Sequence, residues 1–120
     1  MDNISELLIK TALKSNMHHK HGSIIIYRNK ILSTGYNYYN LLNGKIYNNN
    51  NNNNYELNKY SIHAEKDAIS KIKNKNILKY CKIYVIRIKN INELEHGYPC
   101  NMCIDLLKKY GLTLKYIKIN

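Results

Sequence analysis

The 120-residue sequence lacks a long apolar run, a disulfide-type set of cysteines and a balance of charge. No apolar segment approaches the roughly 20 residues of a membrane-spanning helix, so we expect no membrane partner. Met1-Asp2-Asn3 is not followed by a basic stretch and an apolar one, so we expect no signal peptide. The cysteines number three, and two of them have the spacing of metal ligands. Their odd count favours a reducing, cytoplasmic location over a disulfide framework.

Acidic residues are scarce: there are 8 of them against 19 Lys and Arg, which gives a formal net charge of +11. Such a charge is typical of proteins that bind the phosphate of a nucleotide, or RNA or DNA. Arginine is also scarce, which weakens the nucleic-acid interpretation, because surfaces that bind nucleic acid usually include arginine, whose planar guanidinium matches phosphate. The abundant residues, Lys, Asn, Ile and Tyr, are those that A/T-rich coding favours, but the absence of Phe does not fit this account. We take compositional drift as the main cause of the charge, and attraction to phosphate stays compatible with it.

A chain of this length fits one domain, residues 1–120, with a single modest core. Apolar residues at helical spacing, and apolar β-rich runs, predict the order α-β-β-α-β-α-β. The helices are expected at 3–17, 62–73 and 100–110, and the strands at 23–28, 31–37, 82–88 and 112–119. The run from Ile24 to Tyr27 indicates a strand buried on both faces. Gly35, near the end of the second strand, indicates a bulge or a close backbone approach.

Polar segments 38–60 and 89–99 are predicted to be loops. The first contains seven consecutive asparagines, from Asn48 to Asn54, and we interpret about 40–60 as a flexible surface insertion within the one domain. Three histidines, His18, His19 and His21, invite a second metal site. A solvated helix end is the simpler interpretation of these three residues.

Two short motifs carry the chemistry: His63-Ala64-Glu65 and Pro99-Cys100-Asn101-Met102-Cys103. A histidine with a carboxylate two residues later, and a Pro-Cys-x-x-Cys further on, form the signature of zinc deaminases. Each motif is expected in the first turn of a helix, where the positive helix end favours thiolate. His63, Cys100 and Cys103 would bind Zn²⁺ and leave the fourth position for water, as in catalytic zinc sites. Glu65 would move protons beside that water.

Other interpretations of these residues are weaker. A Cys-x-x-Cys can be a redox pair, but redox pairs usually have proline between or after the cysteines, and Pro99 precedes both. Cys81 opens a predicted strand and is expected to be a buried thiol rather than a ligand.

With these motifs the chain resembles the cytidine deaminase-like superfamily of zinc deaminases, over roughly residues 20–119. Ser33-Thr34-Gly35-Tyr36-Asn37 is similar to the second strand of the family, and Ser61 to Ile69 to its zinc helix. The resemblance implies a three-layer α/β/α sandwich with a mixed sheet, a homo-oligomer, and Asn37 and Ala64 as substrate-binding residues. It also implies hydrolytic deamination by hydroxide on the zinc, with Glu65 as the proton shuttle.

The substrate is less sharply indicated. Asparagine after the first cysteine, at Asn101, resembles the motif of deoxycytidylate deaminases. Methionine before the second cysteine, at Met102, resembles that of adenosine and guanine deaminases. We expect a cytosine nucleotide or nucleoside, of deoxycytidylate or cytidylate type. One alternative is a deaminase of adenosine or cytosine in RNA or DNA, similar to tRNA-adenosine deaminases. Another is a non-catalytic binding module with a structural zinc, although such a module has no use for Glu65.

Overall fold

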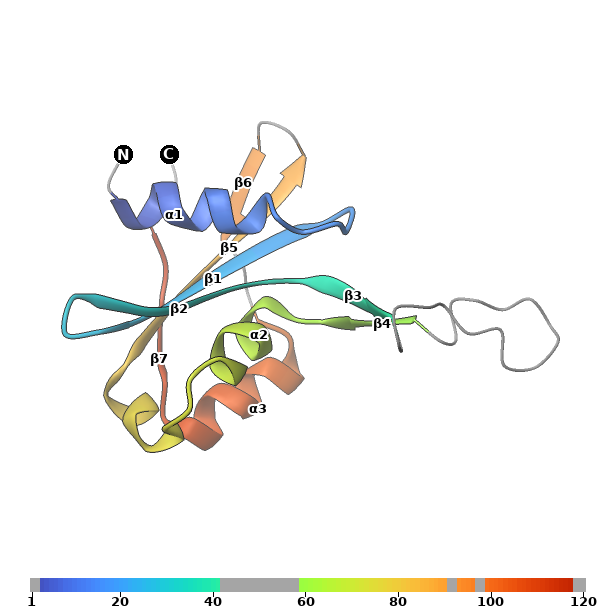
Figure 1. The fold of residues 1–120 in the computed structure, drawn as a ribbon. Coiled ribbons are helices and arrows are strands. Elements are labelled where there is room, and N and C mark those ends of the chain that lie inside the picture. The colour runs from blue at the N-terminus through green and yellow to red at the C-terminus, as the bar shows by residue number, and fades with distance from the viewer. Residues whose placement is uncertain (1–2, 42–58, 91–92, 97–98, 118–120) are drawn as a thin grey trace, which may run out of the picture.

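The computed structural model describes residues 3–41, 59–90, 93–96 and 99–117. Its helices and strands form three layers, with a sheet in the middle (Figure 1). In chain order the elements are α1 (Asn3–Ala12), β1 (Lys20–Tyr27), β2 (Lys30–Tyr36), β3 (Tyr38–Leu41), β4 (Lys59–Ile62), α2 (Ala64–Ser70), the 3-10 helix η3 (Lys75–Tyr80), β5 (Lys82–Asn90), β6 (Glu93–His96), α3 (Asn101–Tyr110) and β7 (Thr113–Lys115). Among the described residues, no helix is long and apolar enough to span a bilayer.

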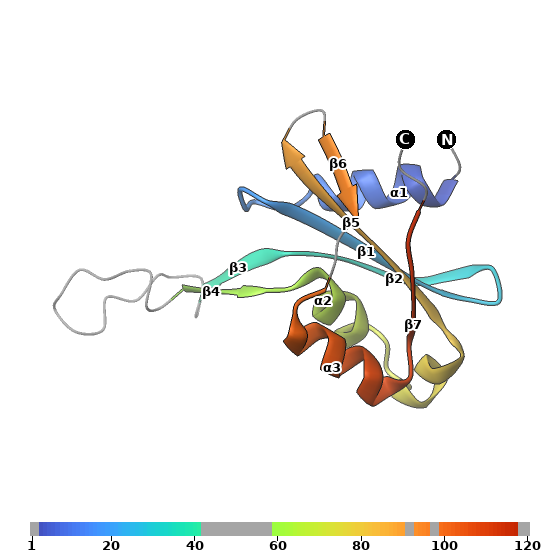
Figure 2. The ribbon, with the colours of Figure 1, turned by 180° about the vertical axis from the view of Figure 1, so that it is seen from behind.

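The main sheet has the order β2-β1-β5, and both β6 and β7 pair with β5 (Figure 2). β7 runs parallel to the first residues of β5, from Lys82 to Tyr84. β6 runs antiparallel to the later part of β5, from Ile86 to Asn90. The pairs β1–β2 and β1–β5 are antiparallel. The expected mixed sheet is therefore confirmed.

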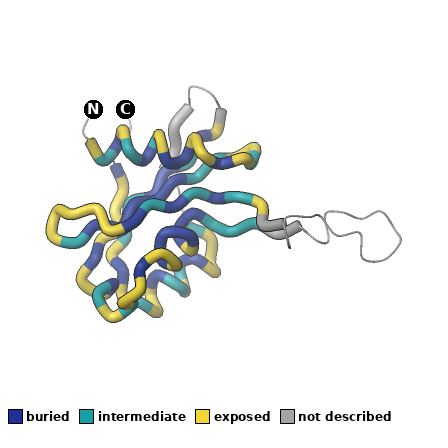
Figure 3. The backbone as a smooth tube through the Cα atoms, viewed as in Figure 1, coloured by how far each residue is buried: buried dark blue, intermediate teal, exposed yellow. Residues whose placement is uncertain are grey.

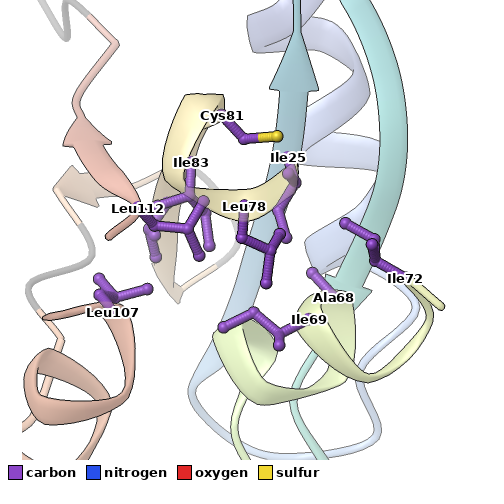
Figure 4. Close-up of a cluster of buried hydrophobic side chains, with 10 residues drawn as sticks. Ile25, Ala68, Ile69, Ile72, Leu78, Cys81, Ile83, Leu107 and Leu112 are labelled. Atoms are coloured by element: carbon purple, nitrogen blue, oxygen red, sulfur yellow. The ribbon is translucent and has the colours of Figure 1, made fainter. Parts of the chain in front are cut away.

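The sheet separates two apolar clusters, one under α1 and one under α2 and α3. Ile24 and Ile26 of β1 face the α1 side, with Leu8 and Ala12. Ile25 faces the other side, in a cluster with residues of α2, η3, β5 and α3 (Figure 4). Because successive side chains of a strand point to opposite faces, an unbroken apolar run fits a strand covered on both sides. Figure 3 shows β1 and β5 buried between the helices, which confirms the α/β/α sandwich.

β1 and β2 form an antiparallel hairpin, with Arg28 and Asn29 as the central residues of its turn. Arg28 and Asn29 have φ of 48° and 65°, as the central residues of a type I′ turn do. Asparagine tolerates this left-handed conformation better than other non-glycine residues, so Asn29 occupies the second position at little cost. The β1–β2 register shifts between Ile25 and Ile26, not at Gly35.

The predicted element order is incomplete, because it lacks β3, β4, β6 and η3. The segments predicted as loops at 38–60 and 89–99 contain paired strands: β3 with β4, and β6 with β5. These strands gain their order from pairing rather than from an apolar pattern of their own. The asparagine run itself lies outside the described residues.

The helices are also shorter than predicted. α1 ends at Ala12 instead of residue 17. Beyond its end, Lys20 Nζ donates to the carbonyl oxygens of Ser15 and Met17 at 2.5 and 3.2 Å. Those carbonyls are therefore satisfied outside a helix. α2 ends at Ser70 instead of residue 73.

Candidate metal centre and cavity

The three residues predicted to bind metal lie at the starts of two neighbouring helices. His63 is the N-cap of α2 and Cys100 the N-cap of α3, and both have extended backbone, with ψ of 152° and 169°. Both residues thus precede their helices rather than lie in the first turn. Cys103 is in the first turn of α3. In Figure 1, α2 and α3 both begin on the side from which the β3–β4 ribbon extends.

The ligand atoms converge on one point. His63 Nδ1 lies 3.2 Å from Cys103 Sγ and 3.5 Å from Cys100 Sγ, and all three atoms lie within 4.8 Å of one another. Zinc bonds of about 2.0–2.3 Å in a tetrahedron place nitrogen and sulfur ligands roughly 3.6 Å apart. A donor set of one imidazole and two thiols therefore fits zinc in both spacing and chemistry. In the described part of the chain, no other group of three metal-ligating side chains is this close.

Glu65 is the second residue of α2 and only 4% exposed. Burial raises the pKa of its carboxyl group, and the nearby His63 offsets part of this effect. The pKa of the Cys103 thiol is also raised, first by burial and then by the charge of Glu65. A cation at the ligand atoms would favour the thiolate against both effects, since metal binding deprotonates a coordinating thiol.

An open cavity of about 310 Å³ adjoins this group. His63, Glu65 and Cys100 line it, whereas Cys103 does not. The remaining walls come from the segment between α1 and β1, the start of β1, the residue between β2 and β3, the β3–β4 ribbon and the start of α2: Met17, His18, His19, His21, Asn37, Tyr39, Ser61 and Ala64. The cavity therefore contains both predicted substrate-binding residues beside the metal centre.

Asn37 is buried, and its side-chain amide binds the backbone on both sides of the start of β1. Its Oδ1 accepts the backbone N–H of His21 at 2.7 Å, and its Nδ2 donates to the carbonyl of His19 at 2.7 Å. The residue therefore positions one wall of the cavity. Ala64 is fully buried, and its carbonyl accepts a hydrogen bond from Ser23 Oγ at 2.8 Å.

Buried hydroxyl groups that the sequence analysis did not identify fix α2 on the sheet. Ser23 of β1 donates to Ala64, and Ser33 of β2 donates to the carbonyl of Ala68 at 2.8 Å. Between these contacts β2 passes very close to the helix: a Cβ on Gly35 would lie 2.3 Å from the carbonyl oxygen of Ala64. The close approach predicted for Gly35 is confirmed. The presence of serines in otherwise apolar predicted strands was the sequence feature that could have indicated these two hydrogen bonds.

The cluster of histidines belongs to the cavity. His18, His19 and His21 all line it, and Arg87 Nη2 lies 3.0 Å from His19 Nδ1. Burial, together with the charges of Arg87 and His63, lowers the pKa of His21 to about 4, so that this ring is neutral at pH 7. The interpretation of these histidines as a helix end is therefore wrong: α1 ends at Ala12, well before His18, and His21 lies in β1. In the sequence, the position of the histidines immediately before the first predicted strand was the feature that could have indicated a place in the cavity wall.

Comparisons with known proteins agree with this geometry. The family model described as "Cytidine and deoxycytidylate deaminase zinc-binding region" matches residues 2–118. The chain is similar to the apo crystal structure of dCMP deaminase from cyanophage S-TIM5, with 21% identity, a TM-score of 0.55, and coverage of 97% of this chain and 86% of that one. The same phage enzyme in complex with dCMP and dUMP matches with 18% identity, a TM-score of 0.47, and coverage of 98% and 99%. No curated protein sequence matches. The chain therefore belongs to the cytidine and deoxycytidylate deaminase zinc-binding family and is a zinc-dependent deaminase.

Proposed function

We propose that this chain hydrolytically deaminates a cytosine nucleotide of deoxycytidylate or cytidylate type. The observation that carries the proposal is the buried carboxyl group of Glu65, which lines one cavity with His63 and Cys100. A zinc site with a purely structural role needs neither an open cavity nor a buried acid beside it.

In this proposal His63, Cys100 and Cys103 hold the zinc. When bound, the metal lowers the pKa of a water ligand towards neutrality and so makes it a nucleophile. Glu65 accepts a proton from the attacking water at its carboxylate and donates it to the ring nitrogen. It then accepts the proton of the hydroxyl group added to the ring carbon and donates it to the amine, which leaves as ammonia while the carbonyl forms. Burial shifts the pKa of Glu65 upward, which is the direction that favours a group that must both accept and donate protons.

Asn37 and Ala64 are proposed to hold the substrate. Ala64 begins α2, and the first N–H groups of a helix have no acceptor within it, so its backbone N–H can donate to the base. Asn37 Oδ1 has a second lone pair besides the one that accepts from His21. We assign this lone pair to a hydroxyl or amine hydrogen of the substrate.

Two observations support a nucleotide over a nucleoside. His18 and His19 line the cavity, and the Arg87 guanidinium lies beside His19, so potential hydrogen-bond donors lie along this wall. A 5′-phosphate would be attracted to them. In addition, the phage enzyme that shares this fold is a dCMP deaminase.

A substrate panel tests the proposal. Ammonia release is measured with dCMP, CMP, deoxycytidine, cytidine, adenosine, guanine, tRNA and single-stranded DNA. We expect release from the cytosine monophosphates, and a loss of about 10²-fold or more in Glu65→Gln with its zinc content unchanged. Activity on tRNA or DNA alone would replace the proposal by a polynucleotide deaminase. A wild type that is silent on every substrate while holding one zinc per chain would favour the binding module.

A further inference from the structure

A second basic site lies at the opposite end of α3 from the metal centre. Four lysines line one hollow of about 430 Å³: Lys75, Lys79, Lys108 and Lys109. Asn76, Tyr110 and Gly111 complete the lining, so the hollow contains no carboxylate. Because α3 has ten residues, the hollow lies roughly 15 Å from Cys100 along the helix axis.

The fold itself brings these lysines together. η3 ends beside the C-terminal end of α3 (Figure 1). The turn between α3 and β7 needs Gly111, whose φ is 72°, and a Cβ there would lie 3.1 Å from the Cβ of Lys79. The backbone of the turn thus passes directly against η3 and places Lys79 near Lys108 and Lys109.

The charge of the hollow is not neutralised from within the described chain. Among the described residues, none of the four lysines has a carboxylate partner within 4.0 Å. Lysines in the last turn of a helix are individually favourable because they oppose its dipole. That effect explains Lys79, Lys108 and Lys109 one at a time. It does not explain the convergence of two helix ends on one hollow, where like charges repel.

Aromatic rings border the same lysines. The Lys79 ammonium lies 5.2 Å from the ring centroid of Tyr80, and that of Lys109 lies 5.3 Å from the centroid of Tyr110. Tyr80 is 66% exposed, which is unusual for a large aromatic residue. Tyr110 is half-buried against the core, whereas Tyr80 is exposed and lies next to the hollow rather than in its lining. A basic hollow with an exposed aromatic ring beside it is a combination that binds single-stranded nucleic acid, since ammonium groups contact phosphates and a ring stacks on a base.

We propose that this hollow binds single-stranded nucleic acid through its phosphodiester backbone, with a base stacked on Tyr80. The site is separate from the catalytic cavity and does not depend on the substrate proposed above. With four phosphate contacts, log affinity should fall against log salt concentration with a slope of about −3.

The test is fluorescence anisotropy of labelled oligouridylate and oligothymidylate over a range of salt. Lys79→Gln/Lys108→Gln should reduce the slope by about 1.4 and weaken binding about 25-fold at about 0.1 M salt. The matched control is Lys10→Gln/Lys14→Gln, which removes the same charge from exposed positions of α1 and its end. It should keep the wild-type slope. Tyr80→Ala should weaken binding about tenfold, and Tyr80→Phe should not, because Phe retains the ring face.

Three results would overturn the proposal. The first is an equal loss in the two double-lysine variants, which would mean that net charge alone attracts the strand. The second is no salt-dependent binding of either oligonucleotide. The third is that inorganic triphosphate binds wild type but not Lys79→Gln/Lys108→Gln, while neither oligonucleotide competes with it. A preference for oligouridylate or for oligothymidylate would show whether the site binds RNA or DNA. Lys79→Gln/Lys108→Gln should deaminate free nucleotide at the wild-type rate.

Discussion

Replacing Gly35 by alanine should damage the metal centre from a distance. The added Cβ would lie 2.3 Å from the carbonyl oxygen of Ala64, 2.5 Å from the backbone nitrogen of Ala68 and 3.0 Å from the Cβ of Ala68. Relief of such contacts requires α2 and β2 to separate by about 1 Å, and overpacking of this kind costs about 3 kcal/mol of unfolding free energy. The midpoint of thermal unfolding should then fall by about 12 °C.

The same displacement moves His63 and Glu65, at the start of α2, away from the cysteines of α3. We therefore expect Gly35→Ala to release ammonia about 100-fold more slowly and to bind zinc more weakly, because misplacement by about 1 Å can cost that much. Metal analysis after dialysis and a kcat measurement on folded protein check both effects.

Gly22→Ala is the matched control. Its Cβ would lie 2.7 Å from the carbonyl oxygen of Leu8, so it strains the contact with α1 on the other face of the sheet. It should lower the thermal midpoint but leave zinc content intact. The double variant Gly35→Ala/Ala68→Gly removes only the side-chain part of the clash. Full recovery of activity in it would refute the reasoning, because the two shorter contacts are with backbone atoms.

Three further outcomes are expected. Cys103→Ser should reduce zinc from about one per chain to a trace, as measured by metal analysis, and retained zinc would exclude Cys103 as a ligand. Ser23→Ala should lower the unfolding free energy in urea by about 1–2 kcal/mol, because the buried carbonyl of Ala64 loses its donor; an unchanged midpoint would contradict this. The folded-state pKa of His21, about 4, lies below its unfolded value, so the unfolded chain binds more protons as pH falls from about 6.5 to 4. The unfolding free energy of wild type should therefore fall by about 2 kcal/mol over this range, a value discounted for the partial exposure of the ring. The unfolding free energy of His21→Gln, measured by urea titration at each pH, should fall less.

The elements with an apolar pattern could be predicted from the sequence. β1 and β5 are buried on both faces, and their continuous apolar runs indicate this directly. Pro99 and Gly111 mark the two ends of α3, because proline suits a helix start and glycine the left-handed turn after it. The motif residues His63, Cys100 and Cys103 were expected to converge, and their ligand atoms lie within 4.8 Å.

The polar elements could not be predicted in this way. β3 and β4 flank an asparagine-rich segment, and their pairing depends on a partner that is distant in sequence. The structural role of the Asn37 amide could not be predicted either. An asparagine after a strand does not indicate that its Oδ1 and Nδ2 bind the backbone of His21 and His19. Local patterns report burial and turns, whereas these contacts arise only when separate segments meet.

The β3–β4 ribbon has a consequence for how this gene can change. Tyr39 and Ser61 face each other across the ribbon and both line the cavity, and the pair Leu41–Lys59 closes the ribbon beyond them. Insertions or deletions between residues 42 and 58 therefore fall beyond the paired residues of β3 and β4 that position the cavity wall. Each doubling of a loop costs only about 0.6 kcal/mol in closure entropy. A variant with a shortened asparagine tract should therefore keep the β3–β4 register, and with it the positions of Tyr39 and Ser61 in the cavity wall.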